Sequence, residues 1–224
     1  MTDKNLTEIV AIIDRSGSMG SLVAETIGGF NNFLEEQKKA GTKATFTLVQ
    51  FDDRYQIDYN GVDINDVKPL DDKTYVPRGM TALFDAVGET VTTVGERLAK
   101  TDEDKRPGQV IFLIITDGEE NSSHEYEGAK IRQMVKHQID KYSWSFVYMG
   151  GGNLETQRVQ GGMLGIGTAN VYAYDLNRTP GVYASINKGV TRRRADFAAG
   201  MAVSADAALL NQDEVDLLTV ESKK

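Results

Sequence analysis

Runs of consecutive apolar residues along the chain alternate with segments in which apolar residues recur every three or four positions. The continuous runs at residues 9–13 and 110–115 predict buried strands. Residues 45–51 and 144–149 are also predicted to be strands, and residues 170–174 are interpreted as an edge strand. The periodic segments predict amphipathic helices, which cover residues 21–39, 81–98, 124–141, 153–160 and 179–200. Strands that alternate with helices in this way are typical of an α/β fold with a parallel sheet.

One further strand breaks the parallel pattern. Residues 55–59 alternate between apolar and polar side chains, and only the turn at 52–54 separates them from the strand at 45–51. A connection this short joins antiparallel strands, because a parallel neighbour needs a long crossover. We therefore expect a doubly wound, mostly parallel α/β sheet of six strands, with one antiparallel edge strand and helices on both faces.

The predicted strands and helices of the domain end near residue 200. We expect one domain over residues 1–200 and a C-terminal tail over residues 201–224, either partly helical or disordered, because its apolar residues are scattered among acids. Three consecutive basic residues, Arg192 to Arg194, stand near the end of the last helix. There we expect them to be solvated and to suit the helix dipole.

Composition and charge narrow the class of protein. The chain has 224 residues, of which 40% are hydrophobic and 26% charged, as is usual for a soluble globular protein. Its formal net charge of −8 argues against nucleic acid and anionic membranes as partners, since phosphate groups attract a basic surface. The absence of cysteine excludes disulfides, thiolate metal sites and a cysteine nucleophile. No signal peptide or membrane span is evident, so we expect a cytoplasmic protein.

The strand at 9–13 ends in a group of oxygen-bearing side chains. Asp14 follows the strand directly, and Ser16 and Ser18 come next, with Gly17 between them to allow a tight turn. A single serine at this place is best explained as the cap of the next helix. A carboxylate and two hydroxyls together favour a site for a hard cation such as Mg²⁺, Mn²⁺ or Ca²⁺.

Two later segments bring oxygens to the same edge of the predicted sheet. Asp117 follows the apolar strand at 110–115, and Thr81 stands where the helix at 81–98 begins. In a doubly wound sheet, the strand order reverses beside the first strand, and ligands bind in the crevice at the carboxyl ends. Both side chains can reach that crevice. Five oxygen ligands leave at least one position of a six-coordinate ion for water or an outside ligand.

Together these segments resemble the metal-ion-dependent adhesion site (MIDAS) of the von Willebrand factor type A (VWA) domain family. Residues 14–18, Asp-Arg-Ser-Gly-Ser, match the family's first motif. Residues 79–83 resemble its threonine loop, and residues 115–118 resemble its aspartate segment. The motifs occur in the family's order, and the resemblance extends over residues 6–200. It implies a VWA, Rossmann-like fold.

The resemblance also implies which residues hold the cation and what the cation does. The implied ligands, some of which bind through water, are Asp14, Ser16, Ser18, Thr81 and Asp117. A partner protein presents an Asp or Glu to complete the shell around Mg²⁺, the cation that we expect. The implied function is therefore non-enzymatic protein–protein interaction. Within the family, the chain is most similar to compact intracellular domains of bacteria and phages, some linked to stress or tellurium-resistance gene clusters.

Residues next to the implied ligands form the expected rim of the partner site. These residues are Arg15, Met19, Met80, Gly118 and Glu119. For the acidic pair at 119–120, the alternatives are a place on this rim and simple exposure to water, and we favour water.

Two other functions fit parts of the same pattern. Asp14 could be the phosphoryl-accepting nucleophile of a Mg²⁺-dependent phosphatase, but such enzymes carry a second Asp where this chain has Ser16. A scaffold without metal is the other alternative, although two carboxylates at one edge would then repel each other. His124 and His137 fit no zinc or catalytic motif and are interpreted as surface residues.

Overall fold

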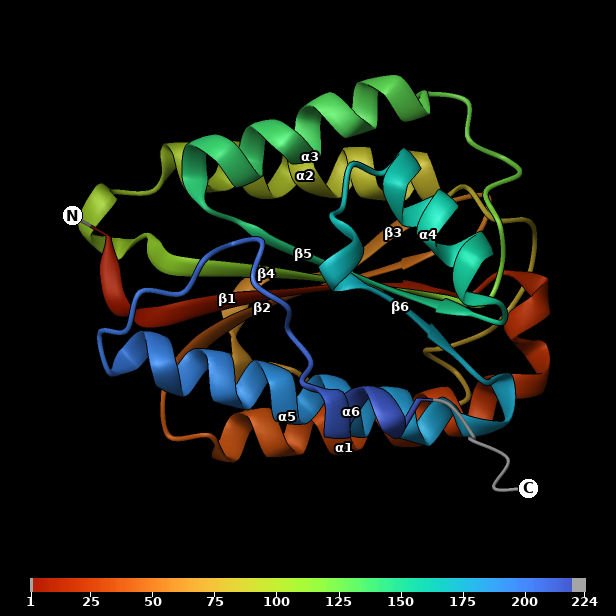
Figure 1. The fold of residues 1–224 in the computed structure, drawn as a ribbon, viewed down its shortest axis with the longest axis horizontal. Coiled ribbons are helices and arrows are strands. Elements are labelled where there is room, and N and C mark those ends of the chain that lie inside the picture. The colour runs from red at the N-terminus through yellow and green to blue at the C-terminus, as the bar shows by residue number, and fades with distance from the viewer. Residues whose placement is uncertain (1, 219–224) are drawn as a thin grey trace.

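A sheet of six strands forms the centre of the computed structural model, which describes residues 2–218 (Figure 1). The strands are β1 (Asp3–Asp14), β2 (Lys43–Phe51), β3 (Tyr55–Asp63), β4 (Pro107–Thr116), β5 (Ser145–Gly151) and β6 (Val171–Tyr174). Their order in the sheet is β3-β2-β1-β4-β5-β6. β3 pairs antiparallel with β2 at one edge, and the other pairs are parallel. The predicted fold class is confirmed.

Helices cover both faces of this sheet. They are α1 (Val23–Lys39), α2 (Leu83–Lys100), α3 (Gly128–Tyr142), α4 (Leu154–Met163), α5 (Thr179–Ala198) and α6 (Gln212–Asp216). Figure 1 shows α1, α5 and α6 on one face and α2 and α3 on the other. α4 packs against β5, β6 and α3. Within residues 2–218, no helix is both long and apolar enough to cross a membrane.

The first strand is buried on both faces, which explains why its apolar residues are continuous rather than alternating. Ile9, Ala11 and Ile13 pack on the side of α1 and α5. Val10 and Ile12 pack on the side of α2 and α3. All five side chains are at most 2% exposed, so β1 is the central element of two cores.

The strand order reverses beside β1, as the sequence predicts. The chain leaves β1 through α1 to reach β2 on one side, while β4 lies on the other side of β1. Ile13 near the end of β1 pairs with Ile115 near the end of β4. The carboxyl ends of these two strands therefore lie side by side, and this edge is where doubly wound sheets bind ligands.

α3 begins at Gly128, four residues after the predicted start at 124. The reason lies in the first turn of α2, where the Asp85 carboxylate accepts hydrogen bonds from three backbone N–H groups. These belong to His124 (2.8 Å), Glu125 (3.0 Å) and Tyr126 (2.8 Å). With their N–H groups held by a side chain from another helix, residues 124–126 form a loop instead of a helical turn.

The arginine run near the end of α5 was predicted to be solvated, but two of its three residues are buried. Arg193 and Arg194 are only 4% and 1% exposed. Arg194 crosses to the other helix on this face and donates to the backbone carbonyl of Gln37 at 2.8 Å and to that of Thr42 at 2.7 Å. The run therefore joins α5 to the end of α1, and charge patterning alone could not reveal this because the acceptors are distant backbone carbonyls.

The segment after Gly200 packs onto the same face of the sheet. Leu209 and Leu210 are 1% and 5% exposed and belong to the core beneath α1 and α5. The short helix α6 carries Glu214, which forms an ion pair with Arg192 of α5. Within the predicted tail, Leu209, Leu210 and Leu218 thus share the core of the predicted domain, whereas most of residues 201–208 are exposed. Residues 219–224 lie outside the described part of the chain.

Candidate metal centre

Asp14 is the last residue of β1, and its side chain is fully buried. One carboxylate oxygen, Oδ1, accepts a hydrogen bond from the Ser16 backbone N–H at 2.6 Å. The other, Oδ2, accepts one from the Thr116 hydroxyl at 2.5 Å. The backbone carbonyl of Asp14 accepts the phenol of Tyr75 at 2.6 Å. These contacts hold the carboxylate at the point where β1 and β4 end.

The turn after β1 brings the two predicted serines together. It continues as a short 3-10 helix, η1 (Gly17–Leu22), and Ser16 and Ser18 lie with their Oγ atoms 3.0 Å apart. Gly17 at the tip donates its N–H to the Gly79 carbonyl at 3.1 Å. A Cβ on Gly17 would lie 3.4 Å from that carbonyl oxygen, so the two loops are in close contact here.

Thr81 reaches the same place from the loop before α2, and a side chain from a third loop holds it there. The Asn121 carboxamide oxygen accepts the Thr81 backbone N–H at 2.9 Å. In return, the Asn121 backbone N–H donates to the Thr81 carbonyl at 3.0 Å. This reciprocal pair joins the threonine loop to the loop after β4, where Asp117 lies.

Asp117 is linked directly to the serine turn. The hydroxyl of Ser18 donates to Asp117 Oδ1 at 2.6 Å. Gly151 at the end of β5 makes room for this loop, because a Cβ there would lie 3.1 Å from the Asp117 Cα atom. The structure therefore brings Asp14, Ser16, Ser18 and Asp117 into one hydrogen-bonded group.

The position of Gly118 shows that Thr81 belongs to the same group. A Cβ atom built on Gly118 would lie 3.3 Å from Thr81 Oγ1, 3.6 Å from Ser18 Oγ and 4.0 Å from Asp14 Oδ2. Oxygens from two loops, the turn after β1 and the loop before α2, therefore converge on a point beside Gly118 in a third loop, where a Cβ would crowd Thr81 Oγ1.

Burial perturbs both carboxyl groups of the cluster. The pKa of Asp14 is raised from 3.8 to about 6, mainly by desolvation of the buried carboxyl group. Hydrogen bonds from Thr116 and Ser16 lower this pKa, and repulsion from the Asp117 charge raises it slightly further. Burial also raises the pKa of Asp117, against the hydrogen bond from Ser18. No ion pair within residues 2–218 involves either carboxylate. Their negative charge is thus not compensated by a basic side chain.

This donor set fits a hard cation. It offers two carboxylates and three hydroxyls, and oxygen ligands are those that Mg²⁺ and Ca²⁺ prefer. Within the described residues, no group of three or more His, Cys, Asp or Glu could hold a metal ion, so a site built on nitrogen or sulfur ligands is not found there. A cation between the carboxylates would offset the cost of burying Asp14 in its charged form.

Two of the five predicted rim residues do not lie at the surface. Met19 is 0% exposed and belongs to the core, because the 3-10 turn directs its side chain inward. Arg15 is 4% exposed, and its guanidinium turns away to form an ion pair with Asp52 at 3.0 Å. The rim assignment of both residues is therefore wrong. By contrast, Met80 is 52% exposed, Gly118 is half-buried and Glu119 is exposed.

Three residues that hold the loops of the candidate site in place were not predicted to do so from the sequence. Asp52, fully buried after β2, accepts Arg15 and also Arg78, at 2.9 Å, and so ties the serine turn to the threonine loop. Glu120 does not simply face water: its carboxylate accepts the backbone N–H of Phe84 at 2.8 Å. Asn121, described above, is the third. Of these residues, only Glu120 was singled out in the sequence, as part of the acidic pair at 119–120, and the backbone group that it binds lies on another element.

Solved structures with the same fold come from distant proteins. Proximal thread matrix protein 1 from the mussel byssus is 17% identical, with a TM-score of 0.57, and the match covers 87% of this chain and 47% of that one. Another structure of that protein has a zinc-occupied MIDAS motif, with a TM-score of 0.55 at 17% identity, covering 84% of this chain and 47% of that one. A von Willebrand factor type A protein from Catenulispora acidiphila has a TM-score of 0.53 at 15% identity, covering 85% of this chain and 42% of that one.

The chain has a VWA fold. It spans less than half the length of these VWA structures. No protein-family model and no curated protein matches the sequence. The likeness of this chain to its structural neighbours is therefore one of fold, and the chemistry of its site must be argued from its own residues.

Proposed function

We propose that the VWA domain binds one divalent cation, Mg²⁺, and thereby holds a carboxylate of a partner protein. The proposed ligands, directly or through water, are Asp14, Ser16, Ser18, Thr81 and Asp117. The observation that carries the proposal is the convergence of three loops on the point beside Gly118, within 4.0 Å of Asp14 Oδ2 and nearer to Thr81 and Ser18.

The bound cation would supply an electrophilic position that attracts an Asp or Glu oxygen from the partner. The chain's own residues supply the rest. Asp14 and Asp117 provide two negative charges, which formally balance a divalent cation, and the hydroxyls provide neutral oxygens. The cation stays electrophilic when one of the two carboxylates binds it through water. The zinc-occupied MIDAS motif of the mussel protein supports a divalent cation at this position of the fold. Hard oxygen ligands favour Mg²⁺ over zinc here.

We propose that this function is non-enzymatic. A phosphatase that used Asp14 as nucleophile would need a general acid two residues later, where the structure has the Ser16 hydroxyl bonded to Ser18. The exposed Met80 beside Thr81 provides apolar surface next to the site, which suits contact with a protein.

Cation binding is tested by calorimetric titration of Mg²⁺ into protein freed of metal with EDTA. We expect saturable binding to the wild type, and none to Asp14→Asn or Asp117→Asn at the same concentrations. Asp72→Asn, at an exposed acid outside the cluster, is the matched control and should bind as the wild type does. Equal affinity of all four proteins would refute the site assignment.

The partner is tested by affinity capture from the native host lysate, in Mg²⁺ and in EDTA, with Asp14→Asn alongside. We expect a partner that is retained only by the wild type in Mg²⁺. Retention that is equal in EDTA would show that the interaction does not pass through the cation. Hydrolysis of p-nitrophenyl phosphate by the wild type, lost in Asp14→Asn, would overturn the non-enzymatic proposal in favour of a phosphatase.

A further inference from the structure

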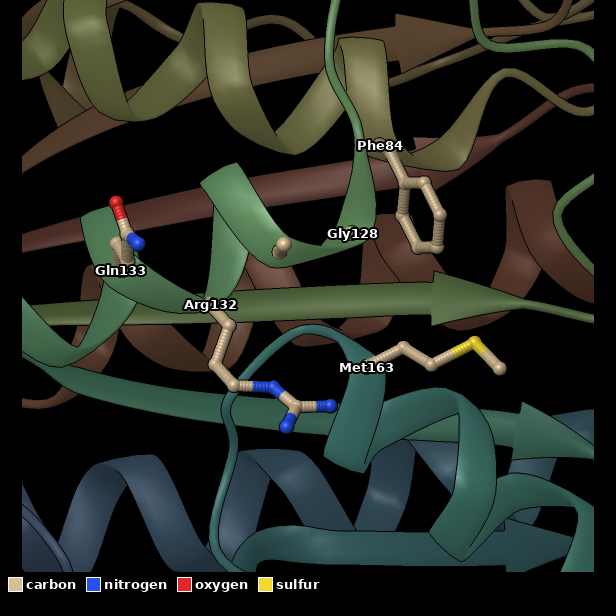
Figure 2. Close-up of a pocket in the computed structure, with 6 residues that line it drawn as sticks. Phe84, Gly128, Arg132, Gln133 and Met163 are labelled. Atoms are coloured by element: carbon tan, nitrogen blue, oxygen red, sulfur yellow. The ribbon is translucent and has the colours of Figure 1, made fainter.

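A groove of about 560 Å³ lies among the helices on the side of the sheet that α2 and α3 cover. The ends of three helices form it: the first turn of α2, the start of α3 and the end of α4 (Figure 2). The residues that line it are Phe84, Gly128, Ala129, Arg132, Gln133 and Met163. None of these residues is a proposed ligand of the cation, so the groove is a separate feature.

Most of the groove surface is apolar, and part of it comes from large side chains left in contact with water. Met163 is 39% exposed, and the Phe84 ring is half-buried. Figure 2 shows Phe84, from α2, and Met163, from the end of α4, on either side of the start of α3 at Gly128. Gly128 leaves the space beside the ring open, because even a Cβ there would touch the ring at 3.4 Å. Methionine is common at surfaces that adapt to a bound apolar side chain.

Arg132 is the one charged residue among those that line the groove, and its position is built into the fold. Gly165, in the turn after α4, has a φ of +81°, and a Cβ there would lie 3.0 Å from Arg132 Cγ. The turn therefore packs against the aliphatic part of the arginine. Within residues 2–218, the guanidinium makes no hydrogen bond or ion pair, and Figure 2 shows it extending past α3 toward the end of α4.

We infer that this groove binds a peptide segment of a partner protein in which a carboxylate stands next to a large apolar side chain. The apolar side chain enters between Phe84 and Met163, and the carboxylate pairs with Arg132, whose planar guanidinium suits a carboxylate. Charge complementarity selects this occupant, since the unpaired guanidinium of Arg132 is the one charge among the residues that line the groove, where it attracts a carboxylate and would repel a basic side chain. The groove is open at the surface, which suits a side chain held by its own backbone better than a free small molecule.

The test uses the full chain labelled with ¹⁵N, in EDTA, so that carboxylate binding at a cation does not contribute. The probe is the acetylated and amidated pentapeptide Ser-Leu-Asp-Leu-Ser, followed by amide chemical shifts. We expect saturable shifts at the residues that line the groove. The analogue with Asn in place of Asp should bind at least tenfold more weakly.

Three variants separate charge from shape. Arg132→Glu should lose binding at least tenfold, whereas Lys141→Glu, the same charge change in the last turn of the same helix, should not. Gly128→Leu should fill the groove and abolish the shifts while the melting temperature is retained. Equal binding of the Asp and Asn peptides, shifts confined to residues 14–18, or no saturable shift would overturn the inference. Concentration-dependent shifts without peptide would also overturn it, because the occupant would then be a second copy of the chain.

Discussion

Replacing Asp14 by Asn is expected to make the metal-free protein more stable, although it removes a proposed ligand. Burial raises the pKa of Asp14 from 3.8 to about 6. At about 1.4 kcal/mol per pKa unit, keeping this carboxylate charged in the folded protein costs roughly 3 kcal/mol at pH 8. Asparagine has nearly the same shape and carries no charge, so this cost disappears in the variant.

The hydrogen bonds around residue 14 can be kept in the variant. An Asn oxygen can still accept the Ser16 N–H, and an Asn NH₂ can donate to Thr116 Oγ1, which now donates to the carboxylate. The Thr116 hydroxyl then has another acceptor, the carbonyl of Gly118 at 3.2 Å. Allowing about 1 kcal/mol for the exchange of a charged hydrogen bond for a neutral one, we expect a net gain of about 2 kcal/mol.

The pH dependence follows from the direction of the shift. Below pH 3.8, Asp14 is protonated in both the folded and the unfolded wild type. As the pH rises, the unfolded chain loses this proton first, so the free energy of unfolding falls between about pH 4 and 6 and stays low above that range. The variant lacks this contribution. The difference between the two proteins should therefore be small at pH 4 and full at pH 8.

The assay is urea unfolding of both proteins at pH 4, 6 and 8 in EDTA, repeated at pH 8 with saturating Mg²⁺. A cation at one hundred times its dissociation constant adds about 2.7 kcal/mol to the wild type and nothing to a variant that cannot bind it. The order of stability should therefore reverse when Mg²⁺ is added. If Asp14→Asn is less stable than the wild type at pH 8 in EDTA, the charged carboxylate is stabilising by itself, and the physical case for a cation fails.

Three further predictions address other parts of the molecule. Gly118→Ala places a methyl group 3.3 Å from Thr81 Oγ1 and should lower the calorimetric affinity for Mg²⁺ about tenfold, an effect of about 1.4 kcal/mol; unchanged affinity would show that the cation does not occupy this point. Asn121→Ala removes the acceptor of the Thr81 N–H. This variant should have a lower affinity for Mg²⁺, while its free energy of unfolding falls by only about 1 kcal/mol. Asn121→Asp keeps the acceptor and should restore the affinity. Leu209→Ala, at a side chain 1% exposed, should lower the free energy of unfolding by about 2–5 kcal/mol in urea; a loss below 0.5 kcal/mol would mean that the segment after residue 200 is not part of the core.

Much of the framework follows from sequence periodicity. The apolar run at 9–13 predicted a strand buried on both sides, and the spacing in 21–39 predicted a helix with one face on a core. The short turn at 52–54 required the antiparallel edge strand. These are local properties of the chain, and the structure has the predicted strands with the predicted edge. The oxygen-bearing residues at the strand ends were found for the same reason, since the pattern itself marks where a strand ends.

The predictions that failed concern side chains whose partners are distant in the sequence. Arg15 was predicted to be an exposed rim residue, but it forms a buried ion pair with Asp52. Arg194 was predicted to be solvated, but it donates hydrogen bonds to the carbonyls of Gln37 and Thr42. The late start of α3 depends on Asp85 of another helix. Hydrophobic periodicity reports which face of an element is buried, but it carries no information on which polar groups meet across elements.

The sequence by itself determined the elements, their order, the class of sheet and the strand ends at which Asp14 and Asp117 lie. Only the tertiary structure decided that the oxygens converge beside Gly118, that Asn121 and Asp52 hold the loops in place, and that Arg132 remains unpaired over an apolar groove. The physical reason is the separation along the chain between the residues that set each property. Backbone conformation and burial of one face are set by neighbours in the chain, whereas a site depends on distances between loops, which exist only after the sheet has brought those loops to one edge.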